Sequence, residues 1–251
     1  MIEYKIDPNA SSNEVAQNFY GGALKSLNES GIPYLVGGAF AINHFTGIFR
    51  DTKDLDIFCR PTDYEKILRR MMGDKYEIEV HDVRWLAKVF HEGFFIDIIF
   101  SSVNNICRVD DVWFENAVAG EVYNVPVKYV SAEEMFWCKM YVQNRERYDG
   151  CDINHIILKY GDRLDWKRVL KRMDNHWQLM LQQVINFQFV YPAERDQVPR
   201  WIFDELIARA QGQFDLPTSV QRVCRGPLIE NLHYAIDIKE WNYKSMTITS
   251  T

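Results

Sequence analysis

The stretch RDTKDLDIF, residues 50–58, places two aspartates, Asp54 and Asp56, among apolar residues. In a strand, residues i and i+2 point to the same face and lie about 6.6 Å apart along it. Asp54 and Asp56 are therefore predicted to share one face, while Leu55 and Ile57 form the buried face. The stretch predicts a core strand whose second face is acidic.

A third carboxylate lies in FFIDIIF, residues 94–100, where Asp97 is surrounded by apolar residues. Burying an unpaired ionised aspartate is costly unless its pKa shifts or a cation compensates its charge. Mg²⁺ suits such oxygen ligands, because it takes one or two carboxylates and completes its octahedron with water and phosphate oxygens. The three aspartates therefore predict a metal site for phosphoryl or nucleotidyl transfer. For Asp54 and Asp56 alone, a solvated strand face is the alternative.

Two glycines precede this region in LVGG, residues 35–38. Gly37 and Gly38 are predicted to end a short strand at residues 34–36 and to lead into a short helix. Backbone N–H groups at such a turn, together with a helix N-terminus, can hold a phosphate. An ordinary turn is the alternative. Phosphate binding at these glycines is therefore supported only by the carboxylates that follow in the sequence.

The first half of the chain alternates apolar strands with helical patterns, whereas the second half has helical periodicity almost throughout. Capping-box patterns at Thr62 with Glu65 and at Ser131 with Glu134 predict two helix starts. Glu92 with Gly93 predicts a tight hairpin turn. The predicted strands are residues 34–36, 54–58, 76–80, 86–91, 94–100 and 125–130. The predicted helices are residues 12–29, 39–45, 62–72, 131–144, 152–160, 165–186 with a break near Asp174, and 199–211.

This order predicts an α/β (α+β) fold. Residues 1–130 should form a small mixed β-sheet core flanked by helices, and residues 131–251 a helical C-terminal domain. The chain lacks an apolar run of membrane-spanning length, and its start lacks the layout of a signal peptide. Its five cysteines are scattered and never spaced as C-x-x-C, which fits a reducing compartment. We therefore expect a cytoplasmic protein with no membrane partner.

The net charge of −6 gives no global reason to expect nucleic-acid binding. A local basic cluster could nevertheless bind RNA. The alternative is that the cluster is simply a solvated helix face. The cluster consists of Lys167, Arg168, Lys171 and Arg172.

Taken together, LVGGAFA, DLDIF and the later IDIIF resemble the signature of the nucleotidyltransferase superfamily related to DNA polymerase β. The stretch RDTKDLDIF particularly resembles the small prokaryotic branch that includes antibiotic nucleotidyltransferases and AbiEii-type toxin nucleotidyltransferases. The resemblance implies a nucleotidyltransferase core at the front of the chain. It also implies transfer of an NMP from an NTP, with ATP favoured, to an acceptor hydroxyl with release of pyrophosphate.

Carried to this chain, the resemblance makes Asp54 and Asp56 ligands of Mg²⁺ or Mn²⁺. It makes Asp97 the third catalytic carboxylate, either a metal ligand or the base that accepts the proton of the attacking hydroxyl. It also implies that Gly37 and Gly38 hold the triphosphate.

Three residues beside the first carboxylate, Arg50, Thr52 and Lys53, match the nucleotide-binding pattern more loosely. A solvent-exposed loop is the alternative for them.

The stretch CKMYVQNRERYDGCDINHIILKYG, residues 138–161, is similar to a later pattern of the same branch. Lys139 and Asp152 then become nucleotide-binding candidates, and Arg145 and Asp149 occupy further matching positions. The alternatives are an ordinary surface lysine for Lys139 and a helix N-cap for Asp152.

The acceptor is open among a small molecule, RNA and a protein. A non-catalytic module of the same fold, such as a toxin–antitoxin partner, is the alternative function. Three mutually repelling carboxylates argue for catalysis, because their cost is offset when they hold metal.

Overall fold

The computed structural model describes residues 4–5, 14–50 and 52–246. The chain divides into two compact units, Met1–Met135 and Phe136–Thr251, and the division falls inside helix α5 (Ala132–Lys139). Within the described residues, every helix is too short or too polar to cross a membrane.

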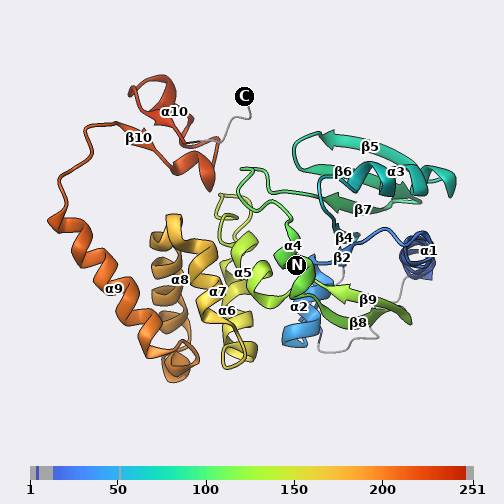
Figure 1. Ribbon diagram of the computed structural model, residues 1–251, viewed down its shortest axis with the longest axis horizontal. Helices are drawn as coiled ribbons and strands as arrows, with labels where there is room; N and C mark the ends of the chain where they lie inside the picture. Colours follow the sequence, from blue (N-terminus) through green and yellow to red (C-terminus); the bar gives the residue numbers. More distant parts are fainter. Residues whose placement is uncertain (1–3, 6–13, 51, 247–251) are drawn as a thin grey trace. The chain divides into compact units, whose positions relative to one another are not determined.

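The first unit is built on a seven-stranded mixed sheet with the strand order β5-β6-β7-β4-β2-β9-β8 (Figure 1). β4 is parallel to β7 and β2 is parallel to β9, and the other neighbouring strands are antiparallel. A separate ribbon pairs β1 with β3. The strands are β1 (Tyr4–Lys5), β2 (Leu35–Val36), β3 (Phe49–Arg50), β4 (Asp54–Phe58), β5 (Glu77–Asp82), β6 (Leu86–His91), β7 (Phe94–Ile99), β8 (Val118–Val122) and β9 (Val125–Tyr129).

The helices of the first unit cover this sheet. α1 packs against α3 and β9, and α2 packs against β4. Leu55 and Ile57 of β4 are fully buried, and each such side chain stabilises the fold by about 1.5–3 kcal/mol. The mixed α/β fold class predicted from the sequence is confirmed. These helices are α1 (Glu14–Ser30), α2 (Gly38–Thr46), α3 (Tyr64–Gly73) and α4 (Asp111–Glu115). Residues 12–13, the predicted start of the first helix, lie outside the described residues.

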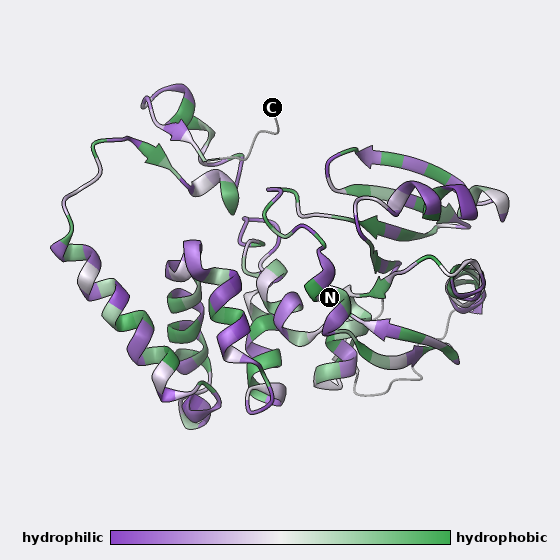
Figure 2. Cartoon of the chain, viewed as in Figure 1, coloured by the Kyte–Doolittle hydropathy of each residue, from purple (hydrophilic) through white to green (hydrophobic). Residues whose placement is uncertain are grey.

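The predicted hairpin turn at Glu92 and Gly93 is confirmed, since both residues have positive φ (46° and 84°) between β6 and β7. Strand β8 was missed, because its turn to β9 uses Tyr123 and Asn124, both at positive φ without a glycine. Figure 2 shows alternating hydrophilic and hydrophobic bands along β5, the strand at one edge of the sheet.

The capping box predicted at Thr62 and Glu65 is wrong. Helix α3 begins at Tyr64, and Asp63 precedes it without a side-chain capping bond. The Asp63 carboxylate instead accepts from Lys66 Nζ at 2.7 Å. At the second predicted box, the Glu134 N–H donates to Ser131 Oγ at 3.5 Å, so the helix start at Ser131 is closer to the prediction.

The second unit is mainly helical, with α8 in contact with α6, α7 and α9 (Figure 1). A 3₁₀ turn at Asp174–His176 interrupts the helix predicted over residues 165–186, as expected. Residues 216–246 were predicted neither as helix nor as strand, and they contain a short parallel pair, β10 with β11. The elements are α6 (Gly150–Tyr160), α7 (Trp166–Met173), η1 (Asp174–His176), α8 (Trp177–Val190), η2 (Pro192–Gln197), α9 (Arg200–Asp215), β10 (Val223–Cys224), η3 (Gly226–Leu228), α10 (Ala235–Lys239) and β11 (Lys244–Ser245).

The helix predicted over residues 131–144 ends early, at Lys139. The chain then turns back on itself, because Asn144 Oδ1 accepts the N–H groups of Glu146 and Arg147 at 3.1 and 2.6 Å. The Asp149 N–H donates to the Val142 carbonyl at 3.0 Å and closes the turn. This turn returns Arg147 and Asp149 to the end of α5.

Candidate active site

Three carboxylates converge on one face of the central strands. Asp54 and Asp56 lie on β4, and Asp97 on β7 is the register partner of Asp56. One ligand oxygen from each residue lies within 4.8 Å of the others, and all three residues are partly exposed. The structure therefore brings together the three aspartates that the sequence singled out.

The glycine turn lies against this group. The Gly37 N–H donates to the Asp56 carbonyl at 2.9 Å, and α2 begins at Gly38. Gly38 has φ +53°, and a Cβ on it would overlap the Asp56 carboxylate. Glycine is needed here both for the left-handed backbone and for the close approach of the chain to a carboxylate.

The three residues that precede Asp54 as nucleotide-binding candidates differ in their surroundings. The Thr52 hydroxyl donates to the Asp54 carboxylate. Arg50 is half-buried in β3, and the Lys53 side chain is exposed while its carbonyl accepts the Phe95 N–H at 3.1 Å. Thr52 thus contacts the first of the aspartates through its side chain.

A cavity of about 690 Å³ lies within the first unit, with Thr52 in its wall. Its lining also includes Arg50, Lys25, Glu121 and Phe40. The volume is in the range of about 300–1,000 Å³ that is typical of small-molecule sites.

Lys88 is a residue that the sequence interpretation missed. Its Nζ donates to Asp97 Oδ1 at 2.6 Å, and it lies opposite Asp97 in the β6–β7 register. Because a two-residue turn at Glu92 and Gly93 fixes the pairing of the strands, the predicted hairpin already contained the signal that pairs these two residues.

The electrostatic setting of Asp97 follows from this pairing. Burial raises the pKa of Asp97, and the nearby Asp54 carboxylate raises it further. The hydrogen bond and the charge of Lys88 lower it, but the pKa stays above its ordinary value. Burial also raises the pKa of Tyr20, and Asp54 raises it further. Among the described residues, the buried Tyr20 hydroxyl has no hydrogen-bond partner.

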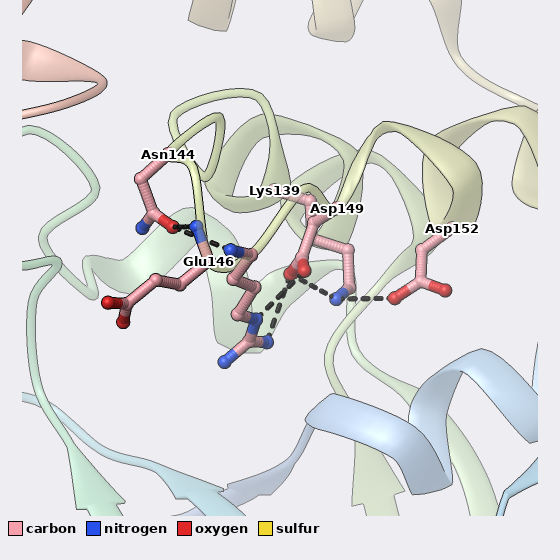
Figure 3. Close-up of polar contacts among 6 residues, drawn as sticks. Lys139, Asn144, Glu146, Asp149 and Asp152 are labelled. Carbon is pink, nitrogen blue, oxygen red and sulfur yellow. Dashed lines mark hydrogen bonds and ion pairs between the residues drawn. The ribbon is translucent and has the colours of Figure 1, made fainter. Parts of the chain in front are cut away.

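The second unit contains its own buried ionic cluster (Figure 3). Lys139 Nζ lies 2.7 Å from an oxygen of Asp149 and 2.7 Å from one of Asp152. These three side chains are only 8, 9 and 8% exposed. Arg147 adds a two-pronged contact to Asp149, at 2.9 and 3.0 Å. Lys139 is therefore a buried, ion-paired lysine and not a surface lysine.

The charges of this cluster set the titration of Asp149. Burial would raise its pKa, but the charges and hydrogen bonds of Lys139 and Arg147 outweigh burial and hold the pKa below its ordinary value. The structure therefore keeps this carboxylate ionised.

One alternative considered from the sequence, a helix N-cap at Asp152, is wrong. Asp149, not Asp152, occupies the N-cap position of α6, and Asp152 lies in the first turn with its carboxylate on Lys139. The arginine that meets the cluster is Arg147, whereas Arg145 uses its backbone N–H to bind Glu230 at 3.2 Å.

The basic cluster on α7 does not form one continuous face. Lys167 and Lys171 are exposed, but the Arg172 guanidinium lies 4.5 Å from the centre of the Trp137 ring. Arg168 is half-buried, and its backbone N–H donates to the carboxylate of Asp165 at 3.1 Å. The exposed basic charge on this helix thus comes mainly from two lysines.

A family model described as an uncharacterised nucleotidyltransferase matches residues 7–187, which is more than half of the chain. The chain belongs to this nucleotidyltransferase family. The superfamily and the enzyme class suggested by the sequence are thereby confirmed. A search of curated proteins found no match.

Several solved structures are similar to this nucleotidyltransferase. The lincosamide antibiotic adenylyltransferase LnuA, in a lincomycin-bound crystal structure, is 18% identical with a TM-score of 0.40, over 56% of this chain and 94% of that one. An antigenic nucleotidyltransferase-like protein from Paracoccidioides brasiliensis is 13% identical with a TM-score of 0.46, over 74% and 94%. JHP933 from Helicobacter pylori is 11% identical with a TM-score of 0.42, over 80% and 95%. Similarities this low assign no substrate or residue role to this nucleotidyltransferase.

The donor set of the nucleotidyltransferase fits a hard divalent cation. Asp54, Asp56 and Asp97 offer carboxylate oxygens close enough to share one ion, which is the ligand type that Mg²⁺ and Mn²⁺ prefer. Lys88 contacts one oxygen of Asp97, and a carboxylate has a second oxygen for a ligand or for a proton.

Proposed function

We propose that this nucleotidyltransferase moves an NMP from an NTP, with ATP favoured, to an acceptor hydroxyl and uses Mg²⁺ or Mn²⁺ held by Asp54, Asp56 and Asp97. The observation that carries the proposal is the convergence of these three carboxylates within 4.8 Å in a chain of the nucleotidyltransferase family. When bound, the metal would polarise phosphate oxygens and stabilise charge on the attacking and leaving oxygens.

The chain's own groups divide the remaining work. The acceptor oxygen forms a bond to the α-phosphorus, the bond to pyrophosphate breaks, and the hydroxyl proton passes to a base. Asp97 is the candidate for this base when its second oxygen is not a metal ligand. The glycine turn at Gly37 and Gly38 would hold the triphosphate through the free N–H groups at the start of α2, since the Gly37 N–H itself is bonded to the Asp56 carbonyl.

The other nucleotide-binding candidates keep their places in the proposal on weaker grounds. Thr52 would position Asp54 through its hydroxyl. Arg50 and Lys53 would contact phosphate, and Lys139 and Asp152 keep only the nucleotide-binding role that the family resemblance implies. Two carboxylates at 2.7 Å already neutralise much of the charge of Lys139, so its attraction for a phosphate is weakened.

A small-molecule acceptor is the acceptor class that we favour. The cavity beside Thr52 has the volume for one. RNA would instead require a basic track, and the exposed charge on α7 comes mainly from Lys167 and Lys171.

The test is transfer of label from α-labelled NTP with Mg²⁺ or with EDTA, in the wild type and in Asp54→Asn and Asp56→Asn. The matched control is Asp111→Asn, an aspartate whose side chain is 75% exposed. We expect transfer to require metal and to be lost only in Asp54→Asn and Asp56→Asn. Undiminished transfer in either variant would rule out the ligand assignment.

The acceptor is tested by offering small hydroxylated molecules, RNA and protein separately. RNA labelling that fails in the double variant K167E/K171E would identify RNA as the acceptor and reject the small-molecule preference. A non-catalytic module would bind NTP without releasing pyrophosphate in any arm.

A further inference from the structure

Lys88 contacts the acidic site but has no role in the proposed reaction. Its Nζ lies 2.6 Å from Asp97 Oδ1 and 4.2 Å from the centre of the Phe95 ring. The side chains of Lys88 and Asp97 are only 19% and 15% exposed. An ion pair this far removed from water is screened much less than a surface pair.

The position of Lys88 is fixed by the fold. It lies within β6, opposite Asp97, in a hairpin whose pairing is continuous from Leu86 with Ile99 to His91 with Phe94. A strand residue in such a ladder has little freedom to move away from its partner. The ammonium is therefore a built-in part of the acidic site.

The site needs such a charge when it holds no metal. Three carboxylates with oxygens within 4.8 Å repel one another, and with Lys88 these four side chains carry a net charge of −2 instead of −3. Lys88 and an arriving divalent cation are attracted to the same carboxylates, and they repel each other.

We propose that Lys88 is the resident counter-ion of the acidic site: it holds Asp97 and compensates the carboxylates until a divalent cation arrives. This role rests on the proposed function and makes Lys88 a positioning residue. A free divalent cation is disfavoured by the ammonium, whereas a metal bound to a nucleoside triphosphate brings negative charge with it. Lys88 thus biases the site toward metal that arrives with the nucleotide.

The test compares Mn²⁺ binding without nucleotide in the wild type, K88M and K88R. We expect K88M to bind Mn²⁺ more tightly by a factor of at least about five. A factor of about five in the dissociation constant corresponds to the repulsion between two unit charges about 4 Å apart in bulk water. K88R keeps the charge and should match the wild type. Lys128→Met, at an exposed lysine on β9, controls for the change in net charge.

Thermal unfolding gives a second readout. In EDTA, K88M should melt below the wild type, and Mn²⁺ should raise its Tm more than it raises that of the wild type, because tighter binding to the folded state stabilises it more. A role limited to packing on Phe95 would leave a loss of stability that Mn²⁺ does not recover. K88Q replaces K88M if the methionine variant does not fold.

The outcomes separate the two proposals. If the wild type binds Mn²⁺ and K88M binds it equally or more weakly, the counter-ion role is overturned and the metal site stands. If the wild type binds no Mn²⁺ with or without ATP, the proposed metal site fails, and the role of Lys88 fails with it.

Discussion

Replacing Gly38 by alanine should separate the chemistry of the site from the stability of the fold. Gly38 has φ +53°, and a non-glycine residue in this region costs about 1–2 kcal/mol. For a chain of this size, that loss corresponds to a fall in Tm of about 2–8 °C. The added Cβ would also overlap the Asp56 carboxylate, which must rotate away from its place beside Asp54 and Asp97.

The displacement should cost far more in activity than in stability. A metal ligand moved by about 1 Å can lower a rate about 100-fold, so we expect metal-dependent NMP transfer by G38A to fall at least about 100-fold. Gly47→Ala is the matched control, because Gly47 also has positive φ (+73°) but nothing lies within 4 Å of a Cβ built there. G47A should share the fall in Tm and keep its transfer rate.

The assay is initial-rate transfer from α-labelled ATP, measured at a temperature where both variants are folded by circular dichroism. Equal rates for G38A and G47A would refute the reasoning, since they would show that the contact between Gly38 and Asp56 is irrelevant to chemistry. Equal Tm values for G38A and the wild type would contradict the estimate of backbone strain.

Three further predictions follow from buried groups. K139M should lower the free energy of unfolding in urea by about 3–5 kcal/mol, because it leaves the buried carboxylates of Asp149 and Asp152 without their lysine, and adding D152N should restore part of the loss. The raised pKa of Asp97 means that it takes up a proton at a higher pH than an ordinary aspartate, so Mn²⁺ binding should weaken on acidification before that of a site built from exposed aspartates. Y20F should leave the Tm unchanged or raise it, because the buried hydroxyl it removes has no hydrogen-bond partner among the described residues; a fall in Tm equivalent to more than about 1 kcal/mol would contradict this.

The local pattern was sufficient for the half of the site that lies on one strand. Alternation in DLDIF placed Asp54 and Asp56 on one face and Leu55 with Ile57 in the core, and the structure agrees. The turn at Glu92 and Gly93 also determined that Lys88 faces Asp97. Side-chain period and hairpin register are local properties, so the sequence determines them directly.

Contacts between distant segments were beyond the local pattern. The parallel register of β4 and β7 sets Asp97 beside Asp56. It depends on how α3, β5 and β6, which separate these two strands in the sequence, pack in the fold. The burial of Lys139 between Asp149 and Asp152 depends on a turn that ends α5 earlier than helical periodicity predicts.

The sequence by itself thus determined the family signature, the strand faces and the candidate residues. Only the tertiary structure decided that three carboxylates meet within 4.8 Å and that Lys139 is buried. The physical reason is that the packing energy of the whole unit sets the register of strands joined by a crossover and the pairing of buried charges. The periodicity of a short segment carries no information about either.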